Sequence, residues 1–213
     1  MRARDRIAAG AAVFPVLRGL WPAALVLLPV AALACPDAGD MAEGVELTLE
    51  GGAVARLMPA GDGLVVDETV TEDGEGYRIT ALHGLWVVEE VEIEGGLPDP
   101  DGAERLDWAG GLESLPAPEP GLEWSGVAEV SMDGLPPYAR GVSVTIGAAE
   151  TVEYGDCSYE SWPVRVANSE DIGDFALQYD YLPLLGVAVL RAYEFEGEPP
   201  DRLTPLAIAP VTP

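Results

Sequence analysis

Residues 45–58 read VELTLEGGAVARLM, an alternation of apolar and polar residues interrupted by two glycines. Val45, Leu47 and Leu49 occupy every second position, so their side chains share one face of a β-strand. The two glycines favour a tight turn, and a second alternating run follows them. The stretch therefore predicts a β-hairpin with one buried face and one solvent-facing side.

The same pattern recurs as far as the C-terminus. Alternating runs separated by turn residues occupy 64–70, 77–82, 85–93, 126–132, 138–146, 151–154, 157–166, 175–182 and 187–195. No run of ten or more residues has the 3.6-residue apolar period of a helix, and 103–115 is only a weak candidate. The chain is therefore predicted to be mainly β, with an antiparallel curved sheet in an open half-barrel or a sandwich and little helix. The prolines of 203–211 restrict that segment to an edge strand or an extended strap.

Residues 95–120 interrupt the pattern. This stretch is rich in Gly, Pro and acidic residues and has no periodicity, so we expect a long connection, attached to the body by Trp108 and Leu112. It could separate two halves of the chain, but one β-rich domain over 35–213 is favoured.

The N-terminus has the features of an export signal. Three arginines fall within the first six residues, and the apolar run over 19–33 is too short for a comfortable span of about 20 residues. The run ends in Ala-Leu-Ala, the small residues that a signal peptidase recognises. We therefore expect a cleavable signal peptide over 1–34, a periplasmic or secreted protein that begins at Cys35, and no transmembrane segment in the mature chain. An uncleaved anchor is the alternative.

Cys35 and Cys157 are the only cysteines of the chain. An even number of cysteines in an exported protein predicts one disulfide between them. The alternative is a lipid anchor on Cys35, because a cysteine directly after a signal sequence is typical of bacterial lipoproteins. The two residues at 32 and 33 depart from the usual order, an aliphatic residue followed by a small one. Lipidation is therefore the second choice.

The charge of the chain limits its partners. The formal net charge is −26, and the first 34 residues hold four arginines and one aspartate, which leaves seven positive and 36 negative residues, or −29, after cleavage. Lysine is absent from the sequence. Such a charge disfavours nucleic acid and anionic membrane surfaces, which need a positive field on the protein. The hydrophobic fraction of 48% is too high for a disordered chain.

No catalytic, cofactor-binding or metal-binding set is recognisable. His83 is the only histidine and lies between two predicted strands, so an exposed turn residue is favoured over a catalytic base. Asp99, Asp101 and the following glycine resemble a fragment of a calcium loop, but an acidic turn is favoured. In the run over 85–93 the glutamates at even positions share a face, which we expect to be solvated rather than a glycosidase site.

The C-terminal half resembles known envelope proteins. The phrase YDYLPLLGVAVLR over 179–191 is similar to a strand, turn and strand of bacterial periplasmic proteins related to the lipoprotein-carrier family. That resemblance implies a half-barrel of antiparallel strands around an apolar hollow. The carriers plug their barrel with helices, which this sequence lacks, so no binding residue is transferred. The phrase around Cys157 is also similar to uncharacterised exported proteins with a cysteine just after the signal, and this likeness supports the disulfide.

Two hypotheses of function follow from these observations. The first is a non-enzymatic envelope or periplasmic module without a cofactor, with an apolar or lipid-like ligand or an envelope protein as its partner. The second is a small hydrolase that uses His83 with a serine or an acid. A cluster around His83 within a pocket would favour the hydrolase, whereas an apolar hollow would favour the binding module.

Overall fold

The computed structural model describes residues 35–170 and 173–212, so the predicted signal peptide lies outside the described residues. Within this part of the chain the mainly β prediction is confirmed, because strands predominate and the helical elements are three short 3-10 helices. No helix among the described residues is long and apolar enough to cross a membrane.

The elements follow one another as short strands with tight connections. The strands of the first half are β1 (Val45–Leu49), β2 (Val54–Gly61), β3 (Leu64–Val70), β4 (Gly76–Leu82), β5 (Trp86–Glu94), β6 (Leu97–Pro98) and β7 (Glu104–Trp108). Those of the second half are β8 (Glu123–Met132), β9 (Tyr138–Ile146), β10 (Glu150–Tyr154), β11 (Cys157–Glu170), β12 (Gly173–Leu182), β13 (Val187–Phe195), β14 (Asp201–Arg202) and β15 (Pro205–Pro210). The 3-10 helices are η1 (Asp40–Ala42), η2 (Pro100–Gly102) and η3 (Leu112–Ser114).

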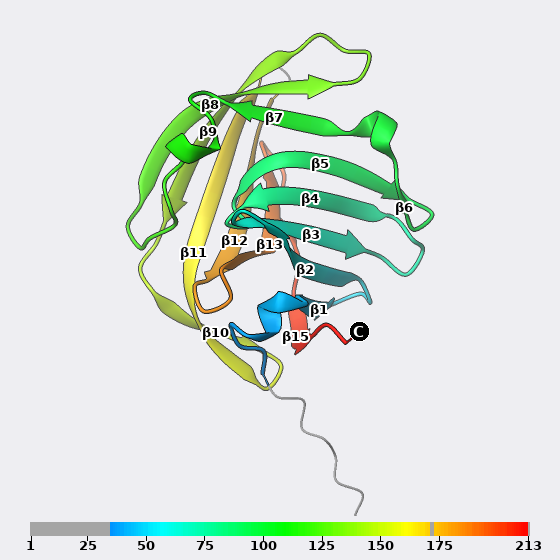
Figure 1. Ribbon diagram of the computed structural model, residues 1–213, viewed down its shortest axis with the longest axis vertical. Helices are drawn as coiled ribbons and strands as arrows, with labels where there is room; N and C mark the ends of the chain where they lie inside the picture. Colours follow the sequence, from blue (N-terminus) through cyan, green and yellow to red (C-terminus); the bar gives the residue numbers. More distant parts are fainter. Residues whose placement is uncertain (1–34, 171–172, 213) are drawn as a thin grey trace, which may run out of the picture. The chain divides into compact units, whose positions relative to one another are not determined.

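The strands form one curved antiparallel sheet (Figure 1). Its order is β14-β13-β12-β11-β9-β8-β7-β5-β4-β3-β2-β1-β15, while β10 pairs with β11 and β6 pairs with β5 at the side. Nearly every strand therefore pairs with its neighbours in sequence, as short Gly-rich connections require of antiparallel strands. Figure 1 shows the sheet curling so that β11 to β13 face β2 to β5 across the interior. The predicted curved, open sheet is confirmed.

The chain itself joins the two ends of this sheet. β14 pairs with β13 at one end and β15 pairs with β1 at the other, yet only Leu203 and Thr204 separate β14 from β15. The amide of Leu203 donates to the carbonyl of Arg191, and the amide of Glu50 donates to the carbonyl of Thr204. Residues 201–210 thus bridge the open edges as an extended strap and end in an edge strand.

Residues 95–120, expected to be a connection, contribute two strands to the sheet, the two-residue β6 and the longer β7. β7 pairs with β8 along its length and with β5 near its start. Leu106 and Trp108 are buried and Asp107 is exposed, so this strand does alternate, but five residues between Gly-rich and Pro-rich flanks are too few for the period to stand out. The weak helical pattern of 103–115 corresponds only to the three residues of η3.

Inward-facing side chains fill the interior in two clusters. One centres on Trp86, Trp108 and neighbouring residues of β8, β9 and β11, and the other joins Leu47 and its neighbours to Tyr154 and Leu182. The indole N–H of Trp86 donates to a carbonyl of the connection before β8 at 3.0 Å, which docks that connection on the sheet. The core thus spans most of the sheet and leaves one end of the curl less filled.

Candidate ligand-binding site

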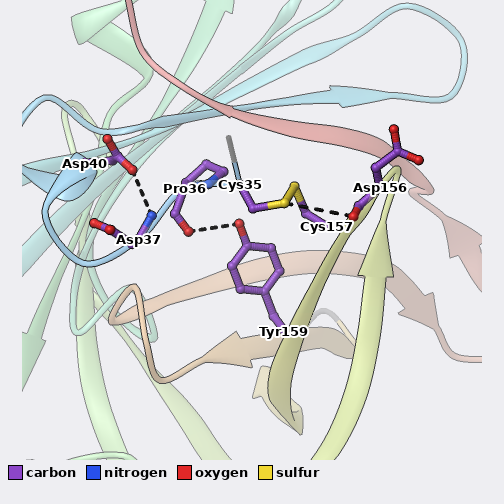
Figure 2. Close-up of a disulfide and its surroundings, with 7 residues drawn as sticks. All are labelled: Cys35, Pro36, Asp37, Asp40, Asp156, Cys157 and Tyr159. Carbon is purple, nitrogen blue, oxygen red and sulfur yellow. Dashed lines mark hydrogen bonds between the residues drawn. A yellow bond between two sulfur atoms is a disulfide. The ribbon is translucent and has the colours of Figure 1, made fainter. Parts of the chain in front are cut away.

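Cys35 and Cys157, the two site residues predicted from the sequence, form a disulfide (Figure 2). Their Cα atoms are 5.4 Å apart although 122 positions separate them in the sequence. Cys157 begins β11 next to the turn from β10, and its side chain is buried. The bond therefore attaches the first described residue to the hairpin of β10 and β11.

The residues after Cys35 are held in the same place by further contacts. Pro36 is fully buried, and its carbonyl accepts a hydrogen bond from the hydroxyl of Tyr159 at 3.0 Å (Figure 2). The amide of Asp37 donates to the carboxylate of Asp40 at 2.8 Å. The Sγ atom of Cys35 that a lipid would modify is the atom that forms the disulfide, so lipid attachment and this bond exclude each other.

His83 and Asp99, which the sequence also singled out, lie in connections between strands. His83 occupies the turn between β4 and β5 with a φ of 56°, and its amide donates to the carbonyl of Gly63 at 2.7 Å. Its side chain is not part of the pocket described below. The carboxylate of Asp99 caps η2 by accepting a hydrogen bond from the amide of Asp101 at 3.1 Å. The acidic turn is therefore organised by its own backbone.

The curled sheet leaves a pocket of about 440 Å³ where β5, β8, β11 and β13 end and where β7, β9 and β12 begin. Its apolar and aromatic lining consists of Ile79, Met132, Phe175, Leu177, Tyr179, Leu190, Tyr193 and Phe195. A narrow extension of about 40 Å³ continues past Leu177 toward Trp86 and Trp108. The volume and the lining are typical of sites for small molecules. No sequence signal located this pocket, because its walls come from eight separate strands.

Five carboxyl groups and one arginine line the same pocket, namely Glu90, Glu92, Glu104, Glu170, Asp174 and Arg140. The Nη2 atom of Arg140 donates to Glu104 at 2.8 Å, and its Nε atom donates to Glu170. The guanidinium also lies 5.7 Å from the centroid of the Phe175 ring. Two carboxylates thus outweigh the charge of Arg140, and the pocket as a whole is strongly acidic.

A β-bulge turns Glu90 and Glu92 toward this pocket. The alternation of 85–93 predicted that these glutamates lie on a solvated face; that prediction is confirmed for Glu92, which is exposed, and wrong for Glu90, which is only partly exposed. The register between β4 and β5 shifts by one residue within β5, and such a shift exchanges the two faces of the strand beyond it. Glu90 consequently lies opposite Ile79, which also lines the pocket, whereas Val91 takes the opposite face.

The carboxyl group of Glu90 lies in an unusual environment. Burial raises its pKa, the nearby negative charge of Glu104 raises it further, and the positive charge of Arg140 acts in the opposite direction. In the part of the chain that the structure describes, none of the seven arginine–carboxylate pairs includes Glu90. Glu90 therefore places a poorly solvated carboxyl group, without an ion-pair partner, at the wall of the pocket.

A second acidic side chain, Asp67 on β3, lies on the inner side of the sheet. It borders a small cavity of about 10 Å³ together with Tyr77, and it accepts a hydrogen bond from the Thr69 hydroxyl at 3.0 Å. Burial raises the pKa of Asp67 to about 7, and the bond from Thr69 offsets only part of that rise. Burial and then the charge of Asp67 raise the pKa of Tyr77. Ionisation of Asp67 is therefore unfavourable in the folded protein.

We expect Asp67→Asn to stabilise the protein at pH 8 and to change little below pH 4. Because the folded-state pKa of Asp67 is about 7, above that of an unfolded aspartate, the unfolded chain loses this proton first. Stability attributable to Asp67 therefore falls as the pH rises through the window from about 4 to about 7. The gain in unfolding free energy at pH 8 is roughly 2–3 kcal/mol, because the carboxyl retains some solvent contact at the cavity.

Urea unfolding of both proteins at several pH values measures this difference. Asp107→Asn, an exposed change on β7, is the control and is expected to shift stability equally at all pH values. A stability difference between Asp67→Asn and the parent that does not depend on pH would contradict the burial of an ionisable carboxyl at this position.

Comparisons with known proteins do not assign the chain to a family. No protein-family model matches it, and no curated protein matches it. Among solved structures, the chain is similar to the hypothetical lipoprotein YmcC from Escherichia coli. That similarity has 13% sequence identity and a TM-score of 0.42, and it covers 79% of this chain and 87% of that one. The resemblance to the lipoprotein carriers is not confirmed by these comparisons.

Proposed function

We propose that this protein is an exported, non-enzymatic binding module of the cell envelope that holds an apolar ligand in the pocket of its curled sheet. The observation that carries the proposal is the hollow of about 440 Å³ with its apolar and aromatic lining. Concave apolar sites of this size with a few polar groups are the usual form of a small-molecule site. His83 lies in a turn away from this hollow, so the hydrolase hypothesis gains no support from its position.

The far end of the hollow is built rigidly. Trp86, Trp108 and Trp124 pack edge to face, with ring centroids 4.8 to 5.9 Å apart. They sit at the opposite ends of the same strands whose other ends form the pocket. The indole N–H of Trp108 donates to the carbonyl of Val87 at 2.8 Å, which fixes one ring of the cluster. A wall that is ordered in advance reduces the entropy that binding must overcome.

We propose that the protein is located in an oxidising compartment outside the cytoplasm. The Cys35–Cys157 disulfide supports it, because such bonds persist in exported proteins and are rare in the cytosol. The same bond favours a free, disulfide-bonded Cys35 over a lipid anchor at that sulfur. Mass spectrometry of the protein purified from its own envelope tests the proposal, since a retained ligand adds to the mass of the folded protein and a lipid on Cys35 would add to the mass of the denatured chain.

Leu177→Trp is expected to weaken binding of a neutral apolar dye, N-phenyl-1-naphthylamine, by roughly tenfold or more. Leu177 lines both the pocket and its inner extension, so a larger ring at this position removes the space that the dye occupies. Dye fluorescence measured against protein concentration gives the dissociation constant. The matched control is Val127→Trp, because Val127 is 49% exposed on β8 and does not line the pocket.

The proposal fails if the parent protein does not bind the dye, or if both tryptophan variants bind it as tightly as the parent. Loss of binding in Leu177→Trp alone supports it. Near-ultraviolet circular dichroism, which reports the Trp86 cluster, verifies that both variants remain folded.

A further inference from the structure

We infer that the ligand of this pocket is a cationic amphiphile, with an apolar chain in the hollow and an ammonium or guanidinium head among the carboxylates of the wall. The inference rests on the proposed binding function and adds the charge and the shape of the ligand. The pocket specifies the chemical class of the ligand and not one particular compound.

The charge balance of the pocket excludes an anionic head. Five carboxyl groups face a single arginine, and that arginine is already bound to Glu104 and Glu170. Arg140 therefore offers no free positive charge to a carboxylate or a phosphate. A cationic head gains attraction from the remaining carboxylates, and at contact distance near a protein surface this attraction is substantial. The net charge of −29 predicted for the mature chain acts in the same direction at longer range.

Glu90 is the carboxyl group with which a cationic head would form an ion pair. Glu90 lines both the pocket and its inner extension. It has no arginine of its own, and it stands next to the pair of Arg140 and Glu104 rather than within it. A poorly solvated carboxylate without a partner is costly, and a cationic head beside Glu90 reduces that cost. The geometry thus favours a positively charged ligand in this pocket.

The aromatic lining suits the same head and its chain. Tyr179, Tyr193 and Phe195 contribute rings to the wall, and a cation over such a ring gains a further attraction. Beyond them the extension continues past Leu177 to the indole rings, where every neighbouring side chain is large and apolar or aromatic except Glu90, Arg140 and Asn168. The pocket thus presents carboxyl groups next to apolar and aromatic side chains, which are the two kinds of contact that an amphiphile makes.

Three probes with the same twelve-carbon chain test the inference: dodecyltrimethylammonium, dodecyl maltoside and laurate. Each is titrated below its critical micelle concentration at pH 8 and low salt, and displacement of the neutral dye reports binding. We expect the cation to bind roughly tenfold more tightly than the neutral probe, and laurate to bind most weakly. The preference for the cation is expected to shrink at high salt, because salt screens the exposed part of the attraction.

Three variants distinguish binding in the pocket from binding to the acidic surface. Glu90→Gln is expected to lower the affinity for the cation severalfold and to leave the neutral probe unchanged. Its matched control is Glu129→Gln, an exposed change on β8 outside the pocket, which is expected to change neither affinity. Leu177→Trp is expected to remove cation binding together with binding of the neutral probe.

The outcomes distinguish this inference from the proposed function. If the neutral probe and laurate bind as tightly as the cation, the inference is overturned and the binding function stands. If the dye binds but none of the three probes displaces it, the inference is overturned and the binding function stands, whereas a parent protein that does not bind the dye overturns both. Cation binding that survives Leu177→Trp, or that falls equally in Glu90→Gln and Glu129→Gln, belongs to the acidic surface and overturns the assignment to this pocket.

Discussion

Replacing Cys157 by serine is expected to lower the free energy of unfolding by about 4–5 kcal/mol. The disulfide closes a loop between residues 122 positions apart, and the chain-entropy model assigns a value of this order to so long a loop. The bond also holds Pro36 in the core, where its carbonyl meets the Tyr159 hydroxyl. For a domain of this size the loss corresponds to a fall in the melting temperature of roughly 10–15 °C.

Denaturant unfolding followed by tryptophan fluorescence measures the effect. Cys35→Ser and the double variant should match Cys157→Ser, because the three proteins lack the same single bond and their losses do not add. Ser158→Ala, an exposed change beside Cys157, is the control and should change the free energy of unfolding very little. Ready alkylation of both cysteines in the native parent, or a diacylglycerol on Cys35, would show that the bond is absent and that this account of the N-terminus is wrong.

Much of the fold could be predicted because the buried face repeats with period two. The run over 45–49 alternates strictly, and the structure buries Val45, Leu47 and Leu49 on one side of β1. Gly-rich turns of a few residues are too short for a parallel crossover, so adjacent strands pair antiparallel. The strap after residue 200 was also predictable, since its prolines cannot donate to a ladder on both sides.

The site could not be predicted, because it depends on features that no local pattern reports. The bulge in β5 exchanges the faces of that strand, and it is what brings Glu90 to the pocket instead of to solvent. Arg140 contacts two glutamates that lie 36 and 30 positions away in the sequence. These groups come together only because β7 lies between β5 and β8 in the sheet. The sequence predicted that the segment containing β7 is a connection. Among many acidic residues, nothing local distinguishes the few that line a pocket.

Arg140→Ala is expected to lower the free energy of unfolding at pH 7 by about 3–5 kcal/mol. The side chain of Arg140 is only 8% exposed, and that of Glu170, its partner, is 4% exposed. Removing the guanidinium leaves Glu170 and Glu104 facing each other near Glu90, without a compensating positive charge. The loss therefore comes mainly from carboxylates left in a poorly solvated site, not from the attraction of one ion pair.

The pH dependence and two matched variants identify this cause. The destabilisation should be smaller at pH 4 than at pH 7, because protonation at acid pH removes negative charge from the wall of the pocket. Arg105→Ala removes an exposed pair with Glu89, whose side chains are 52% and 39% exposed, and should cost less than about 1 kcal/mol.

Arg140→Met combined with Glu170→Met should recover part of the loss, because it replaces the more deeply buried pair by apolar side chains of similar length. Urea unfolding at pH 4 and pH 7 measures all four proteins. If the double variant is no more stable than Arg140→Ala, or if the loss does not depend on pH, then the arginine acts by packing on Phe175 rather than by neutralising the acidic wall of the pocket.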